Sequence, residues 1–457
     1  MEKNTTSRRS ALIVAAASSF VTPFMGSSIN VALPSIEKAF QIDAVLLSWV
    51  ATAYLLAIGV SLVPMGRLAD IYGRKKILAI GFACFTTASL LSALAWSAYS
   101  LIAFRIIQGF GSGMIFGTSM AILTSVFPPN ERGRVLGISV ASVYVGLSSG
   151  PFVGGILTQH LSWRSLFVVT FLLCLIVLRL ILFKLEGEWA DAGGEPFDIP
   201  GSLIYGLTLV FLITGFSLLP DMKSIVLLAL AGVGMVLFVV QENRTRFPVF
   251  KIELLSKNRT FALSNAAALI HYSATFAVTF LISLYLQYLK GLNAQSAGFI
   301  LISQPVMMAL FSPLAGRISD YMEPRFIASF GMGTTSIGLI LLTFLTQHSP
   351  IVFVVGVLLL MGFGFAMFSS PNMNAIMSSV DRRFLGIASG SAGTMRVLGQ
   401  LFSMGMATLV LALFMGRVPI TEDVYPLLMK SIRTVLILFS GLTFFGIFAS
   451  LARGSIR

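Results

Sequence analysis

Residues 66–75 read GRLADIYGRK, and residues 316–325 read GRISDYMEPR. Glycine, arginine and aspartate recur at the same three places in both stretches, at a constant offset of 250 positions. Each stretch is a polar loop between two long apolar runs, and each lies at the same place within its half of the chain. This internal repeat predicts a protein built from two similar halves.

The composition places these halves in a membrane. Of the 457 residues, 56% are hydrophobic and 11% are charged, with a mean hydropathy of +0.91. Soluble globular proteins carry roughly 25% charged residues, so this chain lacks the polar side chains to cover a water-facing surface. A disordered chain, a disulfide scaffold and a cytosolic enzyme are excluded, and an all-α membrane protein is predicted.

The sequence is also basic, with 31 Lys and Arg residues against 18 Asp and Glu residues. These cations form no basic face interleaved with aromatic residues, so no nucleic-acid partner is expected. Cys84 and Cys174 lie inside apolar runs, as packing residues do, and the three histidines are too scattered to ligate a metal. We therefore expect neither a metal nor a cofactor.

Fourteen apolar runs are long enough to cross a hydrocarbon core of about 30 Å as helices. The first follows Lys3, Arg8 and Arg9, and its length predicts an uncleaved helix and not a signal peptide. The runs cover residues 11–34, 45–66, 77–97, 99–127, 134–158, 163–184, 199–219, 224–242, 260–289, 293–316, 326–346, 350–377, 385–415 and 430–452.

Charge predicts the orientation of these helices. An even number of spans puts both termini on one side, and with the N-terminus inside, most cations fall in cytoplasmic segments. We expect a multi-pass protein of a prokaryotic-type plasma membrane, with both termini in the cytoplasm and the lipid bilayer as its surroundings.

Two polar segments divide the runs into six, two and six. An acidic segment, 186–201, follows the sixth run, and a second segment, 241–260, follows the eighth. We expect an N-terminal six-helix bundle over residues 1–185, a linker with two inserted helices over 186–259, and a C-terminal six-helix bundle over 260–457. Two parallel six-helix halves, related by an axis along the membrane normal, are typical of carriers that open to one side at a time.

The residue types of the repeated loop suit a contact that can form and break between the two halves. Glycines let helix ends approach closely, Asp70 can face a helix N-terminus or a cation, and Arg74 and Lys75 can latch onto the partner half. A carrier needs a breakable cytoplasmic latch because its halves rock against each other. An ordinary charged loop is the alternative, which the repeat disfavours. The predicted inside-gate residues are Gly66, Asp70, Gly73, Arg74, Gly316, Asp320 and Arg325.

Arg105 lies inside the fourth run, where a cation is costly and normally faces the interior of a helix bundle. Gln108, Ser112 and Phe116 follow at helical spacing, so all four residues share one face. Snorkelling of Arg105 to the external interface is the alternative.

The fifth run contains GLSSGPFVGG, in which Gly146, Gly150 and Gly154 form one stripe and Pro151 lies in mid-span. Small residues at this spacing let helices pack closely, and proline removes one backbone hydrogen bond. Generic helix packing is the alternative interpretation of this stripe.

These motifs resemble those of the major facilitator superfamily, and within it the fourteen-helix drug:proton antiporter family. GRLADIYGRK is similar to the loop signature between helices 2 and 3, LIAFRIIQGFGSG to the helix-4 arginine motif, and GLSSGPFVGG to the helix-5 motif of antiporters. INVALPSI in the first run and LYLQYLKGLNAQSAGFILISQP at 284–305 also match the family. The resemblance covers essentially the whole chain. Its motifs are specific for the superfamily, less specific for antiport, and unspecific for substrate.

The resemblance implies a major facilitator fold, with two pseudo-symmetric six-helix bundles and the seventh and eighth helices inserted outside them. It implies that Asp70 and Arg74 govern the inside gate and that Arg105 takes part in proton coupling. It also implies that Gly150 and Pro151 form the kinked helix that seals a cavity, which helices 1, 4, 9 and 12 line.

The chain departs from the family at one position. Family members commonly carry an aspartate five residues before the asparagine of NVALP, and this chain has Met25 there. No acidic residue lies deep inside a predicted span, although a buried carboxylate is the usual proton carrier and the usual attraction for cationic drugs. The coupling candidates are therefore Arg105, His271 and Arg396. A packing role is the alternative for His271, and an architectural role for Arg396.

Further residues are expected to line the cavity. They are polar side chains embedded in the spans and aromatic rings that offer a surface to a lipophilic substrate, and packing is the alternative for each. The candidates are Met25, Asn30, Tyr54, Gln108, Ser112, Phe116, Tyr144, Asn265, Tyr272, Thr275, Phe368, Asn372 and Gln400.

We expect a secondary active transporter, and not an enzyme, that exports lipophilic or drug-like small molecules by alternating access and proton antiport. The alternative is an exporter of an anionic or neutral metabolite or lipid, which an interior without carboxylates favours. The expected partners are the bilayer, the transported small molecule and protons, and the protein is expected to act as a monomer.

Overall fold

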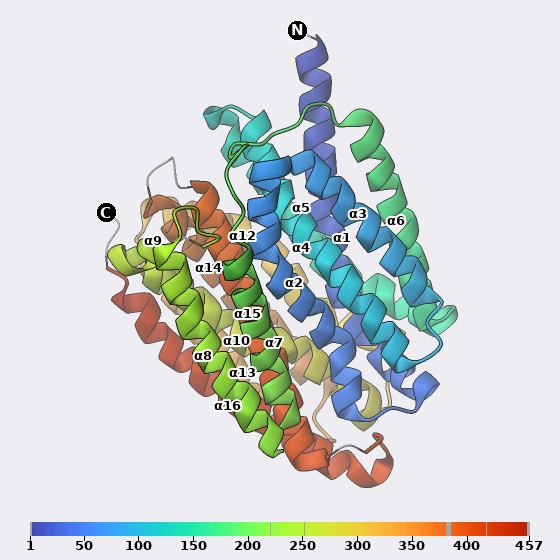
Figure 1. The fold of residues 1–457 in the computed structure, drawn as a ribbon. Helices are drawn as coiled ribbons and strands as arrows, with labels where there is room; N and C mark the ends of the chain where they lie inside the picture. The colour runs from blue at the N-terminus through green and yellow to red at the C-terminus, as the bar shows by residue number, and fades with distance from the viewer. Residues whose placement is uncertain (1, 220, 251, 381–384, 417, 455–457) are drawn as a thin grey trace. The chain divides into compact units, whose positions relative to one another are not determined.

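The computed structural model describes residues 2–219, 221–250, 252–380, 385–416 and 418–454, and it is almost entirely helical (Figure 1). The first half contains α1 (Glu2–Phe40), α2 (Ala44–Tyr72), α3 (Arg74–Ala93), α4 (Ala98–Val126), α5 (Pro129–His160), α6 (Trp163–Lys184), α7 (Ile199–Leu218) and α8 (Met222–Arg244). The second half contains α9 (Ile252–Lys257), α10 (Arg259–Leu284), η1 (Tyr285–Leu289), α11 (Ala294–Leu301), α12 (Ser303–Tyr321), α13 (Pro324–Thr343), α14 (Ile351–Ser378), α15 (Leu385–Met415), η3 (Glu422–Val424) and α16 (Tyr425–Ala452).

Fourteen helical segments among the described residues are long and apolar enough to cross a membrane, which confirms the predicted number. The ninth span runs from α10 through the π-helical turn η1, and the tenth joins α11 to α12 across Ile302. The predicted all-α membrane fold is therefore correct.

Capping residues explain where several helices begin. Ser97 and Ser100 form a capping box before α4, with backbone-to-hydroxyl distances of 3.2 and 3.1 Å. Asn258 caps α10 by accepting a hydrogen bond from Phe261 N at 2.9 Å. Pro324 occupies the first turn of α13, where its fixed φ suits a helix start.

The helices pack into two compact units. Unit 1 comprises Met1–Ala32, Trp49–Leu212 and Ala229–Phe250, and unit 2 comprises Leu33–Ser48, Ile213–Leu228 and Lys251–Arg457. The inserted helices α7 and α8 thus contribute to both units. The three-part division of the chain at residues 185 and 259 stays a prediction.

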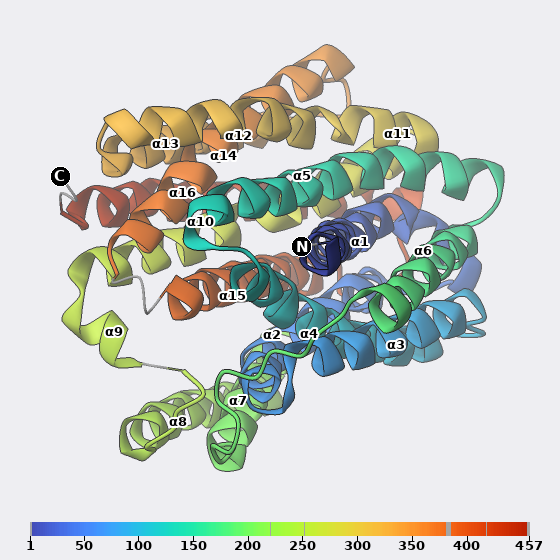
Figure 2. The same ribbon diagram turned by 90° about the horizontal axis from the view of Figure 1, so that it is seen from above.

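Glycines let the helices within each unit approach at backbone distance. In unit 1, a Cβ on Gly111 of α4 would lie 2.7 Å from Gly81 O and 2.8 Å from Phe85 N of α3. In unit 2, a Cβ on Gly364 of α14 would lie 2.8 Å from Thr335 N of α13. Only glycine fits at such distances. The pairs α3–α4 and α13–α14 are therefore tight, and each lies side by side in Figure 2.

Candidate functional site

Arg74, the first residue of α3, lies at the centre of a polar network in the motif loop of unit 1. Its Nε and Nη2 atoms donate to Asp70 Oδ1 at 2.9 and 2.7 Å, and Nη2 also lies 2.8 Å from Asp191 Oδ2. Nη1 donates to Ser125 Oγ of α4. All of these partners belong to unit 1. The predicted latch between the two halves therefore stays a prediction.

Glu188, in the linker after α6, caps the start of α3. Its two carboxylate oxygens accept hydrogen bonds from Lys75 N at 2.8 Å and Lys76 N at 3.2 Å. A carboxylate at this position satisfies free helix N–H groups and interacts favourably with the helix dipole. Gly73 has a φ of 114°, and a Cβ there would collide with the Glu188 side chain. Glycine is thus required at position 73 both for backbone conformation and for space.

The linker backbone also bonds to the motif loop. Arg74 N donates to Trp189 O at 2.9 Å, and Ala192 N donates to Asp70 O at 2.9 Å. These bonds join the two ends of the loop to a segment more than a hundred residues later in the sequence. The linker is therefore part of the motif site.

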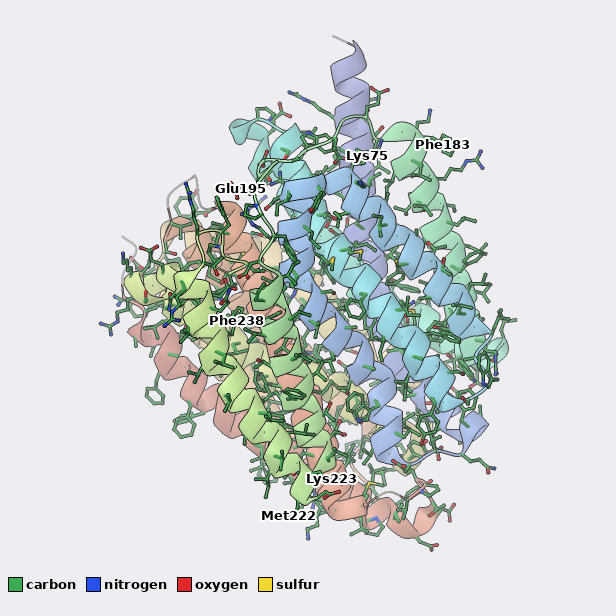
Figure 3. The ribbon with its side chains drawn as sticks, in the orientation of Figure 1. Lys75, Phe183, Glu195, Met222, Lys223 and Phe238 are labelled. Atoms are coloured by element: carbon green, nitrogen blue, oxygen red, sulfur yellow. The ribbon has the colours of Figure 1, made fainter. Side chains whose placement is uncertain are left out.

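The composition of the segment 186–201 indicates only a boundary and does not predict this role. Its third acidic contact is the ion pair between Glu195 and Arg67 of α2. Figure 3 shows Glu195 and Lys75 toward the same end of unit 1. The signal that could have revealed the contact is a run of acids in a basic chain, predicted on the same membrane side as the motif cations.

The repeated loop in unit 2 is built differently. Asp320 is exposed and accepts a hydrogen bond from Asn374 Nδ2 at 3.4 Å. Within the described ranges, no ion pair joins Asp320 to Arg325. The sequence explains the difference, because at the constant offset of the repeat the counterpart of Arg74 is Pro324. The second copy therefore keeps the aspartate of the motif without the arginine that binds it.

A different arginine is buried beside this second loop. Arg453, just after α16, is 1% exposed and donates from Nη2 to Pro324 O at 3.0 Å. Its Nη1 donates to Asn372 Oδ1 at 2.7 Å and to Ser264 Oγ at 3.3 Å. Burial lowers the pKa of Arg453 to about 10, so the side chain keeps its charge at neutral pH. The sequence around Arg453 does not predict this site, because an arginine that follows an apolar run is typical of a solvated helix end.

Arg105 on α4 is completely buried within unit 1. Its Nε donates to Val50 O of α2 at 3.1 Å, and its Nη1 donates to Gln108 Oε1 at 2.6 Å. The guanidinium lies 4.0 Å from the centre of the Tyr54 ring, a cation–π contact. The Tyr54 hydroxyl in turn lies 2.6 Å from Ser112 Oγ. The structure thus brings four predicted site residues together around one charge.

The Arg105 network contains no carboxylate among its described partners. Gln108 Nε2 donates to Ser89 Oγ of α3 at 2.8 Å, which extends the network to a third helix. Arg105 Nη2 has no hydrogen-bond partner in the described part of the chain. A buried donor without an acceptor is costly, so the network can take one further acceptor without breaking an existing bond.

The glycine stripe of α5 packs against α1 within unit 1. A Cβ on Gly154 would lie 2.9 Å from Ser28 Cβ and 3.1 Å from both Ser28 Cα and Ser28 O. A Cβ on Gly146 would collide with Phe20 O, and one on Gly150 would collide with a serine side chain of α1. The stripe therefore sets the distance between the two helices.

Met25 occupies a closed position in unit 1. It is 0% exposed, and its Sδ accepts a hydrogen bond from Thr170 Oγ1 of α6 at 3.4 Å. Methionine fills this gap as a packing residue between α1 and α6. A lining role for Met25 stays a prediction.

His271 on α10 is completely buried in an aromatic cluster of unit 2. Its ring centre lies 4.1 Å from that of Phe368, 5.0 Å from that of Phe365 and 6.2 Å from that of Tyr272. Neither ring nitrogen has a hydrogen-bond partner within the described ranges. A second proton on this ring would add a buried charge without an acceptor. The arrangement therefore suits a neutral packing residue in this conformation.

Three of the predicted polar residues form hydrogen bonds to α10 or from it within unit 2. Asn265 Oδ1 accepts a hydrogen bond from Ser391 Oγ of α15 at 3.1 Å, and Thr275 Oγ1 donates to His271 O at 2.8 Å. Asn372 Nδ2 donates to the backbone of α10 at 3.1 Å. The Asn265 and Asn372 bonds join α10 to α15 and α14, whereas the Thr275 bond lies within α10.

The other predicted site residues are buried or half-buried, and their functional roles stay predictions. They are Asn30, Gly66, Phe116, Tyr144 and Pro151 in unit 1, and Gly316, Arg396 and Gln400 in unit 2.

The fold and these motifs define a membrane transporter. The sequence matches the family model of the Major Facilitator Superfamily over residues 15–404, so the chain belongs to this superfamily. The predicted family and the predicted fold class are thereby confirmed.

The chain is 31% identical over 398 residues to the riboflavin transporter RibZ of Clostridioides difficile (strain 630), across 87% of this chain and 86% of RibZ. It is 30% identical over 394 residues to the multidrug resistance protein Stp of Mycobacterium tuberculosis (strain CDC 1551 / Oshkosh), across 85% of this chain and 73% of Stp. A solved D-xylose-proton symporter superposes with a TM-score of 0.65 at 15% identity, over 95% of this chain and 97% of that one. This last likeness shows the fold alone.

Proposed function

We propose that this protein exports lipophilic or drug-like small molecules by alternating access, in exchange for protons that move inward. The observation that carries the proposal is the buried Arg105 guanidinium, stacked on Tyr54 and left with one free donor. Such a group can change partners when a substrate or a proton arrives. The similarity to Stp supports a drug-like substrate.

The membrane, orientation and assembly state are part of this proposal. The chain lies in the plasma membrane with both termini in the cytoplasm, because most of its cations then face the cytoplasm. It works as a monomer, since one chain supplies both repeats of the motif loop.

A neutral or anionic metabolite is the second candidate substrate class. The similarity to RibZ supports it, because riboflavin is an uncharged, flat aromatic molecule at neutral pH. Two features of unit 1 also favour it. Arg105 bonds to no described carboxylate, and Met25 stands where the family commonly has an aspartate. A lipophilic cation has less electrostatic attraction to such an interior.

Reconstituted flux tests both candidates. Purified protein in proteoliposomes is offered tetraphenylphosphonium, a fluorescent organic anion or riboflavin, with and without an acidic lumen. For an antiporter, an acidic lumen should accelerate uptake because protons leave as substrate enters. A protonophore should remove this acceleration.

Variants separate transport from leakage. Arg105→Gln should lower the proton-driven flux, whereas Arg179→Gln, which changes an exposed arginine of α6, should leave it at the wild-type level. Flux of riboflavin or the anion alone would establish the second candidate. A substrate flux that does not change with the pH gradient would refute antiport. A flux that does not saturate with substrate concentration would refute a carrier of either kind.

A further inference from the structure

Two carboxyl groups face each other at one end of the α7–α8 hairpin, within unit 1. Asp198 directly precedes α7, Glu242 lies in the last turn of α8, and they are 6% and 4% exposed. The two helices pack together there, with the Tyr205 and Phe238 ring centres 5.4 Å apart. Figure 3 labels Phe238 on α8. Asp198 ends the linker segment 186–201, but among the described residues neither carboxyl accepts a hydrogen bond from the motif loop.

Each carboxyl has one satisfied oxygen and one unsatisfied oxygen. Asp198 Oδ1 accepts hydrogen bonds from Gly201 N at 3.0 Å and Gln241 Nε2 at 3.3 Å, and Glu242 Oε2 accepts one from Phe250 N at 2.7 Å. Among the residues that the structure describes, Asp198 Oδ2 and Glu242 Oε1 have no hydrogen-bond partner. A Cβ on Gly201 would lie 2.7 Å from Glu242 Oε1 and closer still to Asp198 Oδ2. Both unsatisfied oxygens therefore lie within 2.7 Å of one point, so they are no farther apart than twice 2.7 Å. The missing side chain of Gly201 leaves the space around that point open.

No described cation neutralises this pair. Arg244 and Arg246 are exposed, and Arg67, from the neighbouring α2, is paired with Glu195. Lys251 lies outside the described residues. Two ionised carboxylates buried side by side would repel each other and lack compensation. Two free oxygens also fall short of the six or more that Ca²⁺ takes, and of the octahedral set that Mg²⁺ demands.

We propose that Asp198 and Glu242 share one proton and form a proton-binding site. The proton resides on Glu242 Oε1 and is donated to Asp198 Oδ2, which satisfies both free oxygens with one hydrogen bond. Helix dipoles fix this assignment. The positive end of α7 stabilises the carboxylate of Asp198, whereas the negative end of α8 disfavours a carboxylate at Glu242.

The proton controls a junction in the chain. Phe250, whose N–H binds Glu242, is the last residue of unit 1, so the acid holds the segment 245–250 that leads into unit 2. Loss of the proton places two like charges together and loosens this hold. The site is independent of the substrate, and it exists whether or not proton flow drives transport.

Hydrogen exchange of the purified protein in lipid nanodiscs, without substrate, tests the proposal. The readout is protection of the amides in 245–250, corrected for the intrinsic pH dependence of exchange. In the wild type, protection of these amides should fall as the pH rises, because the held state binds the proton more tightly than the released state. The total fall in protection should be about tenfold for each tenfold difference in proton affinity between the two states. In Glu242→Gln, protection should not depend on pH, because the amide accepts from Phe250 N and donates to Asp198 as the protonated acid does. Glu186→Gln, which changes an exposed linker acid, should behave as the wild type.

Infrared spectroscopy supplies a second measurement that does not rely on one variant. A protonated carboxylic-acid carbonyl band should be present near neutral pH and should disappear in Glu242→Gln and in Asp198→Asn. Absence of that band, pH-independent protection in the wild type, or loss of protection in a folded Glu242→Gln protein would each overturn the proposal. Protection that rises with added Na⁺ or Mg²⁺ would overturn it as well, in favour of a cation site.

Discussion

Replacing Gly154 with alanine should force α5 away from α1. The new Cβ would lie 2.9 Å from Ser28 Cβ and 3.1 Å from Ser28 Cα and O, whereas ordinary contacts begin at 3.4 Å. Two of the three atoms are backbone atoms, which cannot rotate away. Overpacking of this kind costs about 1–3 kcal/mol, and the better helix propensity of alanine returns roughly 1 kcal/mol.

Gly137, on the same helix, provides the matched control. A Cβ there would meet nothing within 4 Å. Gly137→Ala should therefore show the propensity gain alone, about 1 kcal/mol of stabilisation. The difference in stability between the two variants isolates the packing cost, about 1–3 kcal/mol.

The assay is the midpoint of thermal unfolding of the purified variants in one detergent, followed by loss of the monodisperse species. Gly154→Ala should unfold at a lower temperature than Gly137→Ala, and Gly137→Ala should unfold at or above the wild-type temperature. Equal midpoints for the two variants would refute the idea that the glycine stripe sets the α1–α5 distance.

Three further predictions concern the polar groups. Asp70→Asn removes the negative charge that pairs with Arg74 and should abolish most flux in proteoliposomes while leaving expression and insertion intact; wild-type flux would count against a gate role. Arg105→Lys should lower flux roughly tenfold, since an ammonium cannot reach Val50 O and Gln108 while stacking on Tyr54, and the effect is measured as initial rate per inserted protein. His271→Ala should lower stability by about 2–5 kcal/mol through a cavity in its aromatic cluster, yet the flux should still respond to a pH gradient; loss of that response in folded protein would instead make His271 the coupling group.

The spans could be predicted from the sequence because a membrane imposes length and apolarity on each helix separately. The ends of the helices were harder to predict from the sequence. The first run was expected to end at residue 34, yet α1 continues to Phe40 and buries Glu37, which accepts a hydrogen bond from Tyr288 at 2.7 Å. A lone acid past an apolar run gives no hint of a partner about 250 residues later.

The same contrast holds for the candidate site: features set by neighbouring residues could be predicted, and features set by distant segments could not. Arg105, Gln108 and Ser112 could be placed on one face because helical spacing is a local property. The contacts of Asp191 and Arg453 could not, because they depend on which distant segments pack together. The acids Glu37 and Glu242 are buried although no carboxylate was expected deep within a span; both lie near helix ends, where composition alone does not distinguish a solvated from a buried group.

The linker that folds over the motif loop alters the electrostatic character of that surface. Arg67 and Arg74 are committed to carboxylates of the same chain, so a count of basic residues overstates the charge that this loop offers to anionic phospholipid headgroups. If this loop faces the cytoplasmic leaflet, as proposed, we expect lipid phosphate groups to compete with Glu195 and Asp191 for the same guanidinium groups. The strength of the contacts between the linker and the motif loop is consequently expected to vary with the lipid composition of the membrane and with ionic strength.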